Sequence, residues 1–163
     1  MKVYYMARSN LKKKKKILPE TRKYWKQQID QKWFSRYIRL LYNESGYCRC
    51  ATCGKLVRVT AIQAGHYIPR NFKPRYDLKN VHPQCVYCNI RMKGNQLPYQ
   101  DYITARYGEK KNKQLRDMQK NKIRYSSYNR ATMRKFAIWL QEQCIEMGYT
   151  EYWKKEPLLG GRV

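Results

Sequence analysis

The sequence predicts an α+β protein in which a small cysteine-stapled core lies between N- and C-terminal α-helices. Two Cys-x-x-Cys pairs stand 31 residues apart, and short alternating or β-branched stretches lie beside them, as is typical of strands. On both sides of this centre, apolar residues recur every three or four positions, which indicates helices. The expected segments are a basic flexible tail over 1–17, an N-terminal helix within 18–46, the core over 47–97, a helical region over 98–153 and a loose tail over 154–163.

The N-terminal helix is expected to run from Pro19-Glu20 to about Leu41. Proline suits the first turn of a helix, and a glutamate there interacts favourably with the helix dipole. Residues 43–46 (NESG) are typical of a stop. The apolar stripe consists of Trp25, Ile29, Trp33, Phe34, Tyr37, Ile38 and Leu41.

Within the core, strands are expected over 56–60, 64–68 and 80–84, with a basic loop over 69–79. A helix is expected to start near Cys88. The predicted order of elements in this part of the core is therefore strand, loop, strand, helix.

Beyond the core, Gly108 is expected to end a helix that begins near Pro98, and a basic helix follows over 110–122. Asn129 is the expected N-cap of a last helix over 130–147, which we expect to pack on the first helix.

The four cysteines of the two pairs predict a structural zinc site. Four thiolates in two C-x2-C pairs suit tetrahedral Zn²⁺ and leave no open coordination position for chemistry. The predicted ligands are Cys50, Cys53, Cys85 and Cys88. Cys48 is an alternative to Cys50, which we prefer because its spacing to Cys53 makes the tighter knuckle. Catalysis must then come from neighbouring residues.

The charge balance predicts a polyanionic partner. The chain carries 36 Lys+Arg against 11 Asp+Glu, a formal net charge of +25. Nucleic acid is the usual partner of such a domain, ahead of membrane surfaces and acidic proteins. The five lysines of 12–16 add affinity for nucleic acid without sequence preference.

No apolar run approaches the ~18 residues of a membrane-spanning helix, and metal-binding cysteines fit a reducing cytoplasm.

The core also contains the residues needed to cut a phosphodiester. Between residues 47 and 95 there are nine Lys/Arg and a single acidic residue, Asp77. The only histidines of the chain, His66 and His82, both lie between the two Cys-x-x-Cys pairs. A neutral imidazole is the natural base for activating water near pH 7. The competing interpretation is that His66 is a zinc ligand or a buried core residue.

Three motifs of the core resemble the NinG/Rap proteins of lambdoid phages: GHYIPR over 65–70, NVHPQC over 80–85 and CN over 88–89. That family belongs to the HNH (ββα-metal) superfamily of endonucleases. The resemblance implies a zinc-stapled, HNH-like ββα core and metal-dependent cleavage of branched DNA, such as Holliday junctions and D-loops, in phage recombination. It further implies a location in the cytoplasm of the bacterial host, associated with the nucleoid.

The resemblance assigns a role to each motif residue. His66 matches the general base, and Asn80 matches the asparagine that ties the strand-loop-strand together and orients that base. Asn89 matches a ligand of the catalytic Mg²⁺ or Mn²⁺, as in phage T4 junction-resolving endonuclease VII. Many members place Asp or His directly before the base as a second ligand, where this chain has Gly65. The alternatives to complete the site are His82, Asp77, or phosphate and water.

The residues expected to hold the DNA backbone are Arg70, Lys73, Arg75, Arg91 and Lys93. Two other functions remain open at this point: a non-catalytic zinc-knuckle protein that binds nucleic acid, and an HNH nicking enzyme that reads sequence in duplex DNA. Symmetric cleavage of a junction calls for a homodimer, and recombination proteins are further expected partners.

Overall fold

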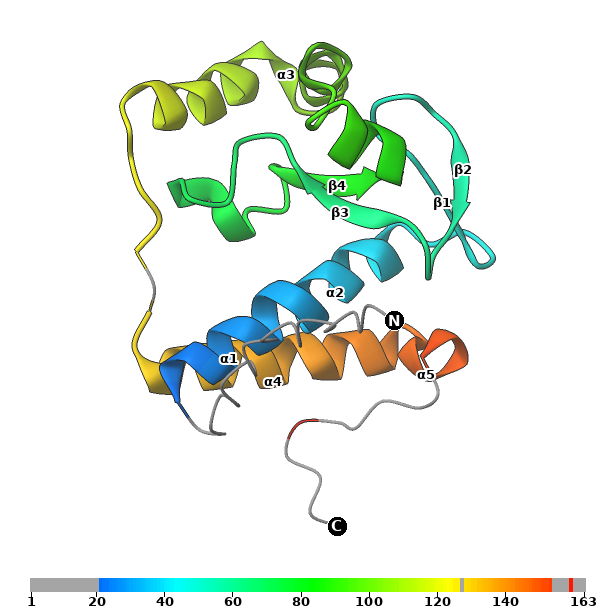
Figure 1. Ribbon diagram of the computed structural model, residues 1–163, viewed down its shortest axis with the longest axis vertical. Coiled ribbons are helices and arrows are strands. Elements are labelled where there is room, and N and C mark those ends of the chain that lie inside the picture. Colours follow the sequence, from blue (N-terminus) through cyan, green and yellow to red (C-terminus); the bar gives the residue numbers. More distant parts are fainter. Residues whose placement is uncertain (1–20, 127, 154–158, 160–163) are drawn as a thin grey trace, which may run out of the picture.

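The computed structural model describes residues 21–126, 128–153 and 159 of the 163-residue chain (Figure 1). The expected basic tail over 1–17 lies outside the described residues. So do Pro19, Glu20 and, apart from Leu159, the expected tail over 154–163. The α+β class predicted from the sequence is confirmed, because helices surround two small antiparallel sheets.

The N-terminal helical segment consists of three consecutive pieces. These are α1 (Arg22–Gln28), a π-helical turn η1 (Ile29–Trp33) and α2 (Phe34–Leu41). The hydroxyl of Thr21 caps α1 by accepting a hydrogen bond from the backbone N–H of Tyr24 at 3.0 Å. The segment ends before residues 43–46, as the sequence predicts.

The C-terminal helix α4 (Arg130–Glu146) packs along α1 and α2, which confirms the expected pairing of the first and last helices (Figure 1). Its N-cap is Asn129, whose side chain accepts a hydrogen bond from the N–H of Thr132 at 2.9 Å. A short helix α5 (Tyr149–Tyr152) follows. The buried core of this layer contains Trp25, Ile29, Trp33, Phe34, Ile38, Leu40, Val81, Met133, Ala137, Leu140, Cys144 and Tyr149.

Two hairpins form the centre of the molecule. Strands β1 (Tyr47–Arg49) and β2 (Leu56–Arg58) pair around the first cysteine knuckle. Strands β3 (Gln63–His66) and β4 (Val81–Gln84) pair antiparallel, and the loop between them contains a 3-10 turn η2 (Lys73–Tyr76). The π-helical η3 (Tyr87–Arg91) follows β4 directly. The sequence did not predict β1.

The β3–β4 hairpin has two functionally different faces. Opposed residues of an antiparallel pair lie on the same face, and neighbours along a strand alternate. Ala64 and Val81 pack into the helical layer, so His66, which pairs with Val81, shares that face at the strand end. Gly65 pairs with His82 and therefore lies on the opposite face. Figure 1 shows the hairpin between α2 on one side and α3 on the other.

Helix α3 (Gln96–Lys120) covers that opposite face of the hairpin. It is kinked at Gly108, whose φ of +81° is a conformation that glycine adopts without steric cost. Helical geometry is interrupted at Gly108 and a second helical segment follows it within α3, as the predicted helix end at Gly108 and the predicted basic helix after it indicate. Within the described part of the chain, no helix combines the length and apolarity needed to cross a membrane.

A buried ion pair joins η1 to the loop of the β3–β4 hairpin. The guanidinium of Arg75 donates to Asp30 with its Nη2 atom at 2.7 Å and its Nε atom at 3.0 Å. Lys26 and Tyr76 also donate to this carboxylate. Burial alone raises the pKa of Asp30, but the hydrogen bonds from Arg75, Lys26 and Tyr76 lower it below its ordinary value. The helical layer is thus fixed to the loop that follows His66.

We expect Asp30→Ala to lower the free energy of unfolding by about 3 kcal/mol, because it leaves the buried Arg75 guanidinium without its carboxylate. Asp117→Ala is the matched control, since Asp117 pairs with Lys113 on the exposed face of α3 at 3.0 Å. This exposed pair contributes about 0.5 kcal/mol or less. Urea denaturation of the two variants measures both values, and equal losses would contradict the assigned importance of the Asp30–Arg75 pair.

Candidate functional site

The four cysteines predicted as zinc ligands converge in space. The sulfur atoms of Cys50, Cys53, Cys85 and Cys88 all lie within 4.8 Å of one another. The Sγ atoms of Cys53 and Cys85 are 3.8 Å apart. A tetrahedron with Zn–S bonds of about 2.3 Å has sulfur-to-sulfur edges of about 3.8 Å. The cluster is therefore consistent with a structural zinc site.

Cys50, and not Cys48, belongs to this cluster. Burial raises the pKa of the Cys50 thiol, but hydrogen bonds, first from the Thr52 hydroxyl and then from the backbone N–H of Cys85, lower it to about 6. Position decides the membership of Cys50, because its sulfur atom lies within 4.8 Å of those of Cys53, Cys85 and Cys88. The thiol of Cys48 instead donates to the carbonyl of Arg39 at 3.2 Å, and burial raises its pKa to about 11.

The cysteine cluster positions η3 against the β3–β4 hairpin. Cys50 and Cys53 lie in the turn between β1 and β2, whereas Cys85 and Cys88 lie at the end of β4 and inside η3. One cluster thus joins the first hairpin to a helix of only five residues. Asn89, which follows Cys88 directly, is placed by the same connection.

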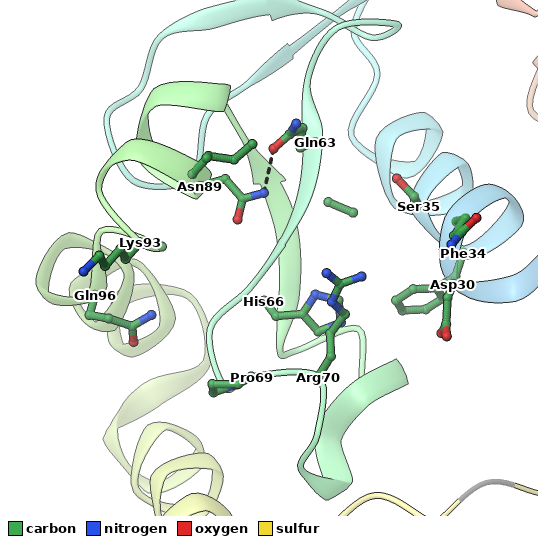
Figure 2. A pocket seen from close by; sticks show the side chains of 14 residues that line it. Asp30, Phe34, Ser35, Gln63, His66, Pro69, Arg70, Asn89, Lys93 and Gln96 are labelled. Atoms are coloured by element: carbon green, nitrogen blue, oxygen red, sulfur yellow. Dashed lines mark hydrogen bonds between the residues drawn. The ribbon is translucent and has the colours of Figure 1, made fainter. Parts of the chain in front are cut away.

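A cavity of about 660 Å³ opens between η3 and the N-terminal helices, across the edge of β3. Four of the residues predicted to act in catalysis or DNA binding line it: His66, Arg70, Asn89 and Lys93. Figure 2 shows Asn89 and Lys93 on one wall, His66 and Arg70 in the centre, and Asp30, Phe34 and Ser35 on the opposite wall. Residues far apart in the sequence therefore meet at one place.

His66 is held in one defined tautomer. Its Nε2 atom lies 3.0 Å from the carbonyl oxygen of Arg75, and a carbonyl only accepts hydrogen bonds, so Nε2 carries the proton. The Nδ1 atom of the neutral ring then carries the free lone pair. Burial lowers the pKa of His66 to about 4, and the charges of Arg70 and Arg75 act in the same direction. The imidazole is therefore neutral at pH 7.

Asn89 is oriented by a residue that the sequence did not reveal. Its Nδ2 atom donates to Oε1 of Gln63 at 2.8 Å. This bond uses the amide nitrogen, and Figure 2 shows the amide oxygen directed into the space between Asn89 and His66. The oxygen of a carboxamide is a hard ligand that suits Mg²⁺ or Mn²⁺. Nothing in the spacing of Gln63 predicts this role, because the contact joins β3 to η3.

Asn80 bridges the loop between β3 and β4. It is fully buried, its Oδ1 accepts from the N–H of Ile68 at 2.7 Å, and its Nδ2 donates to the carbonyls of Ile68 and Pro74 at 3.0 Å each. These hydrogen bonds stabilise the loop between β3 and β4. The same loop contains Arg75, whose carbonyl accepts a hydrogen bond from His66. Asn80 does not line the cavity, so its geometry suits orientation of the base.

His82, the second predicted histidine, lies among tyrosines on the α3 side of the hairpin. Tyr99 donates its hydroxyl proton to the carbonyl of Gly65, so this hydroxyl accepts from Nδ1 of His82 at 3.1 Å. The Nε2 atom then accepts from Tyr107 at 2.9 Å. Both ring nitrogens are thus engaged, and His82 is not among the residues that line the cavity.

Asp77, the other residue considered as a metal ligand, accepts hydrogen bonds from Lys111 and from the N–H of Lys79. It does not line the cavity either. Of the remaining basic residues, Lys73 and Arg91 are exposed outside the cavity, whereas the charge of Arg75 is matched by Asp30. The backbone carbonyl of Arg75 accepts the hydrogen bond from Nε2 of His66, so Arg75 is suited to orient the imidazole ring.

Comparison with known proteins identifies the family. The family described as Bacteriophage Lambda NinG protein matches residues 4–143. The chain belongs to this family. It is 34% identical over 99 residues to protein ninG of Escherichia phage 933W, a stretch that covers 58% of this chain and 46% of that protein. It is 35% identical over 98 residues to the ninG protein of Salmonella phage P22 (58% and 45% covered) and 33% identical over 99 residues to that of Escherichia phage lambda (58% and 45% covered).

The alignments with these relatives therefore span about half the length of each of them. No solved structure matches the chain. The family assignment agrees with the resemblance that the three core motifs carry.

We expect Cys88→Ser to remove bound zinc and to lower the free energy of unfolding by at least about 3 kcal/mol, because metal binding and folding of such a site are coupled. Cys48→Ser is the matched control and should keep one zinc per chain. Elemental analysis of the purified variants and their thermal melts measure both effects. Loss of zinc from the Cys48 variant with retention in the Cys88 variant would contradict the proposed ligand set.

Stability should fall in acid because of the two buried histidines. Burial lowers the pKa of His82 to about 3 and that of His66 to about 4, against about 6.5 in an unfolded chain. The unfolded chain therefore binds more protons, and the stabilisation present above pH 6.5 is lost as the pH falls toward 4. We expect His82→Gln to reduce the slope of unfolding free energy against pH between 6.5 and 4. Denaturant melts at several pH values measure it, and an unchanged slope would contradict the assignment.

Proposed function

We propose that this NinG-family protein is a metal-dependent endonuclease that cleaves branched DNA, such as Holliday junctions and D-loops, in phage recombination. One observation carries the proposal: a neutral His66 and the amide oxygen of Asn89 converge on one basic cavity beside a zinc-type cysteine cluster. In this proposal β3, β4 and η3 form an HNH-like ββα core.

The donor set fits a hard divalent cation. The amide oxygen of Asn89 is directed into the cavity, and Mg²⁺ or Mn²⁺ accepts such a ligand together with water and phosphate. When bound, this cation would neutralise the charge that develops on the phosphate and on the leaving oxygen. The cysteine cluster would take no part in the chemistry, because four thiolates would leave a bound zinc no open coordination position.

His66 supplies the base in this mechanism. Its Nδ1 atom takes a proton from water while the water oxygen bonds to phosphorus and the bond from phosphorus to the leaving oxygen breaks. The carbonyl of Arg75, which accepts from Nε2, stabilises the imidazolium that forms. The Asp30–Arg75 ion pair keeps the guanidinium charge of Arg75 from opposing this step.

The DNA backbone is held by charge and not by base reading. Arg70 and Lys93 line the cavity, and Lys73 and Arg91 are exposed outside it. Such contacts go to phosphates and carry no sequence information directly, so selectivity comes from the shape of branched DNA. A homodimer would bring two such cavities to the two strands of a junction. Recombination proteins are the partners that this role implies.

The second candidate is a DNA-binding protein without catalysis, favoured by Gly65, which offers no side chain for a second metal ligand. The third is a nicking enzyme that reads sequence in duplex DNA. Both alternatives are compatible with the cysteine cluster and the basic cavity. A cleavage assay is therefore needed to distinguish them from the proposed function.

We expect His66→Ala to lower the rate of junction cleavage by about 10²- to 10⁴-fold, as loss of a general base does. Its junction affinity should stay within about twofold of wild type. The measurement uses a labelled four-way junction beside its linear duplex arms, in Mg²⁺, in Mn²⁺ and in EDTA. The matched control is the other histidine: His82→Gln should retain cleavage at a temperature where the variant is folded.

Three results would contradict the proposal. Tight junction binding without cleavage in either metal supports the binding protein. Cleavage of linear duplex at fixed sites supports the nicking enzyme. Cleavage by His66→Ala at the wild-type rate removes His66 from the mechanism.

A further inference from the structure

The end of α3 and the segment that follows it are basic and lie outside the cavity lining. Residues 118–141 contain six Lys/Arg and no Asp or Glu. The first three of these cations along the chain are Lys120, Lys122 and Arg124, and all three are exposed. Among the described residues, no carboxylate forms an ion pair with any of them. Their charges are therefore available to an anionic partner.

Lys122 occupies a backbone conformation that favours glycine. Helix α3 ends in a Schellman motif, in which the N–H of Ile123 donates to the carbonyl of Met118 at 2.9 Å. The N–H of Lys122 donates to the carbonyl of Gln119 at 3.0 Å, and its φ is +53°. The left-handed residue of such a helix end is usually glycine, because a Cβ atom adds steric cost there. Local stability therefore favours glycine, and a role in folding does not explain the lysine side chain.

The segment after Lys122 is joined to the loop of the β3–β4 hairpin. Backbone hydrogen bonds of 2.9 and 3.0 Å connect residues 71–73 with residues 123–125. At the centre of this pairing, the guanidinium carbon of Arg124 lies 4.7 Å from the centre of the Phe72 ring. This contact orients the exposed guanidinium, which can still donate to a phosphate.

This pairing holds the basic segment beside the loop that leads out of the cavity. Figure 1 shows the segment, in yellow, passing along the hairpin loop that contains η2. The paired residues 71–73 begin directly after Arg70, which lines the cavity. DNA that enters the cavity can therefore continue along the segment.

We propose that Lys120, Lys122 and Arg124 form a second DNA-binding surface, the arm-binding surface, which holds the phosphate backbone of a duplex arm of the branched DNA. The inference rests on the DNA binding included in the proposed function. Cations without acidic partners suit the phosphate backbone, and such contacts carry no sequence information. The surface suits an arm and not the cleaved position, because the scissile phosphate must lie at His66 inside the cavity.

The variant Lys122→Gly should affect stability and DNA binding in opposite directions. Glycine relieves the steric cost at a φ of +53°, so the melting temperature should equal or exceed that of the wild type. Loss of one phosphate contact should raise the Kd for DNA about threefold or more at about 0.1 M salt. It should also reduce the slope of log K against log salt by about 0.9, and adding Lys120→Gln should reduce it by about 0.9 again.

The experiment measures fluorescence anisotropy of a labelled four-way junction and of one of its linear duplex arms. It uses full-length, zinc-loaded protein without added divalent cation, so that binding is observed without cleavage. An arm is present in both DNAs, so the Kd should rise by the same factor on each.

The matched control is Lys55→Gln, which also removes one positive charge. Lys55 is exposed in the turn between β1 and β2, on the other side of the molecule from the arm-binding surface (Figure 1). Its Kd should stay within about twofold of wild type, because salt screens a charge that contacts no phosphate.

Three results would overturn the inference. Wild-type affinity and salt slope in Lys122→Gly would remove the arm-binding surface. An equal loss in Lys55→Gln would assign the effect to net charge. A loss confined to the junction would place the contact at the branch point and not on an arm. If Lys122→Gly melts below the wild type, Lys120→Gln tests the same surface by the same criteria.

Failure of this inference and failure of the proposed function are distinguishable. Unchanged DNA affinity in the variants, with wild-type protein cleaving junctions, removes the arm-binding surface and leaves the nuclease function intact. Weakened affinity in the variants, with no cleavage by wild-type protein in Mg²⁺ or Mn²⁺, keeps the surface and supports the binding protein without catalysis. Wild-type protein that binds neither DNA overturns both.

Discussion

The convergence of four cysteine side chains at the start of η3 is the constraint on which the rest of the site depends. A helical turn of five residues has too few internal hydrogen bonds to hold its own position. Its first turn carries Cys88, and the cluster joins that turn to the knuckle between β1 and β2. Asn89 therefore reaches the edge of β3, where Gln63 fixes the direction of its amide. Without the cluster, nothing local in the sequence of η3 would hold the amide oxygen opposite His66.

The electrostatics of the cavity combine a basic environment with an uncharged imidazole, that of His66. The chain has a formal net charge of +25, which favours a polyanionic partner, yet a charged imidazole could not accept a proton from water as the proposed mechanism requires. Burial resolves this conflict because it disfavours the imidazolium. The carbonyl of Arg75 then determines which nitrogen keeps the proton, and Asp30 balances the guanidinium of the same residue. One arginine thus orients His66 with its backbone while its side chain is neutralised.

Several elements follow from local pattern alone. The helical periodicity of the N-terminal segment, the Asn129 cap and the stop at residue 148 each depend on residues a few positions apart. The loop between β3 and β4 and the two knuckles are equally local. The widening of the first helix into a π-helical turn at 29–33 and the pairing of β1 with β2 were not predicted, because packing against other elements decides such features.

The sequence by itself determined the four cysteines that cluster, the position of His66 on a strand and the asparagine that follows the last cysteine. These depend on spacings that the covalent chain fixes within a few residues. Only the tertiary structure decided which partner each side chain has. Arg75 and Asp30 are 45 residues apart, Asn89 and Gln63 are 26 apart, and Gln84 covers Gly65 from the neighbouring strand. The reason is physical: a hydrogen bond or ion pair depends on distances of about 3 Å, and packing of distant elements sets these distances.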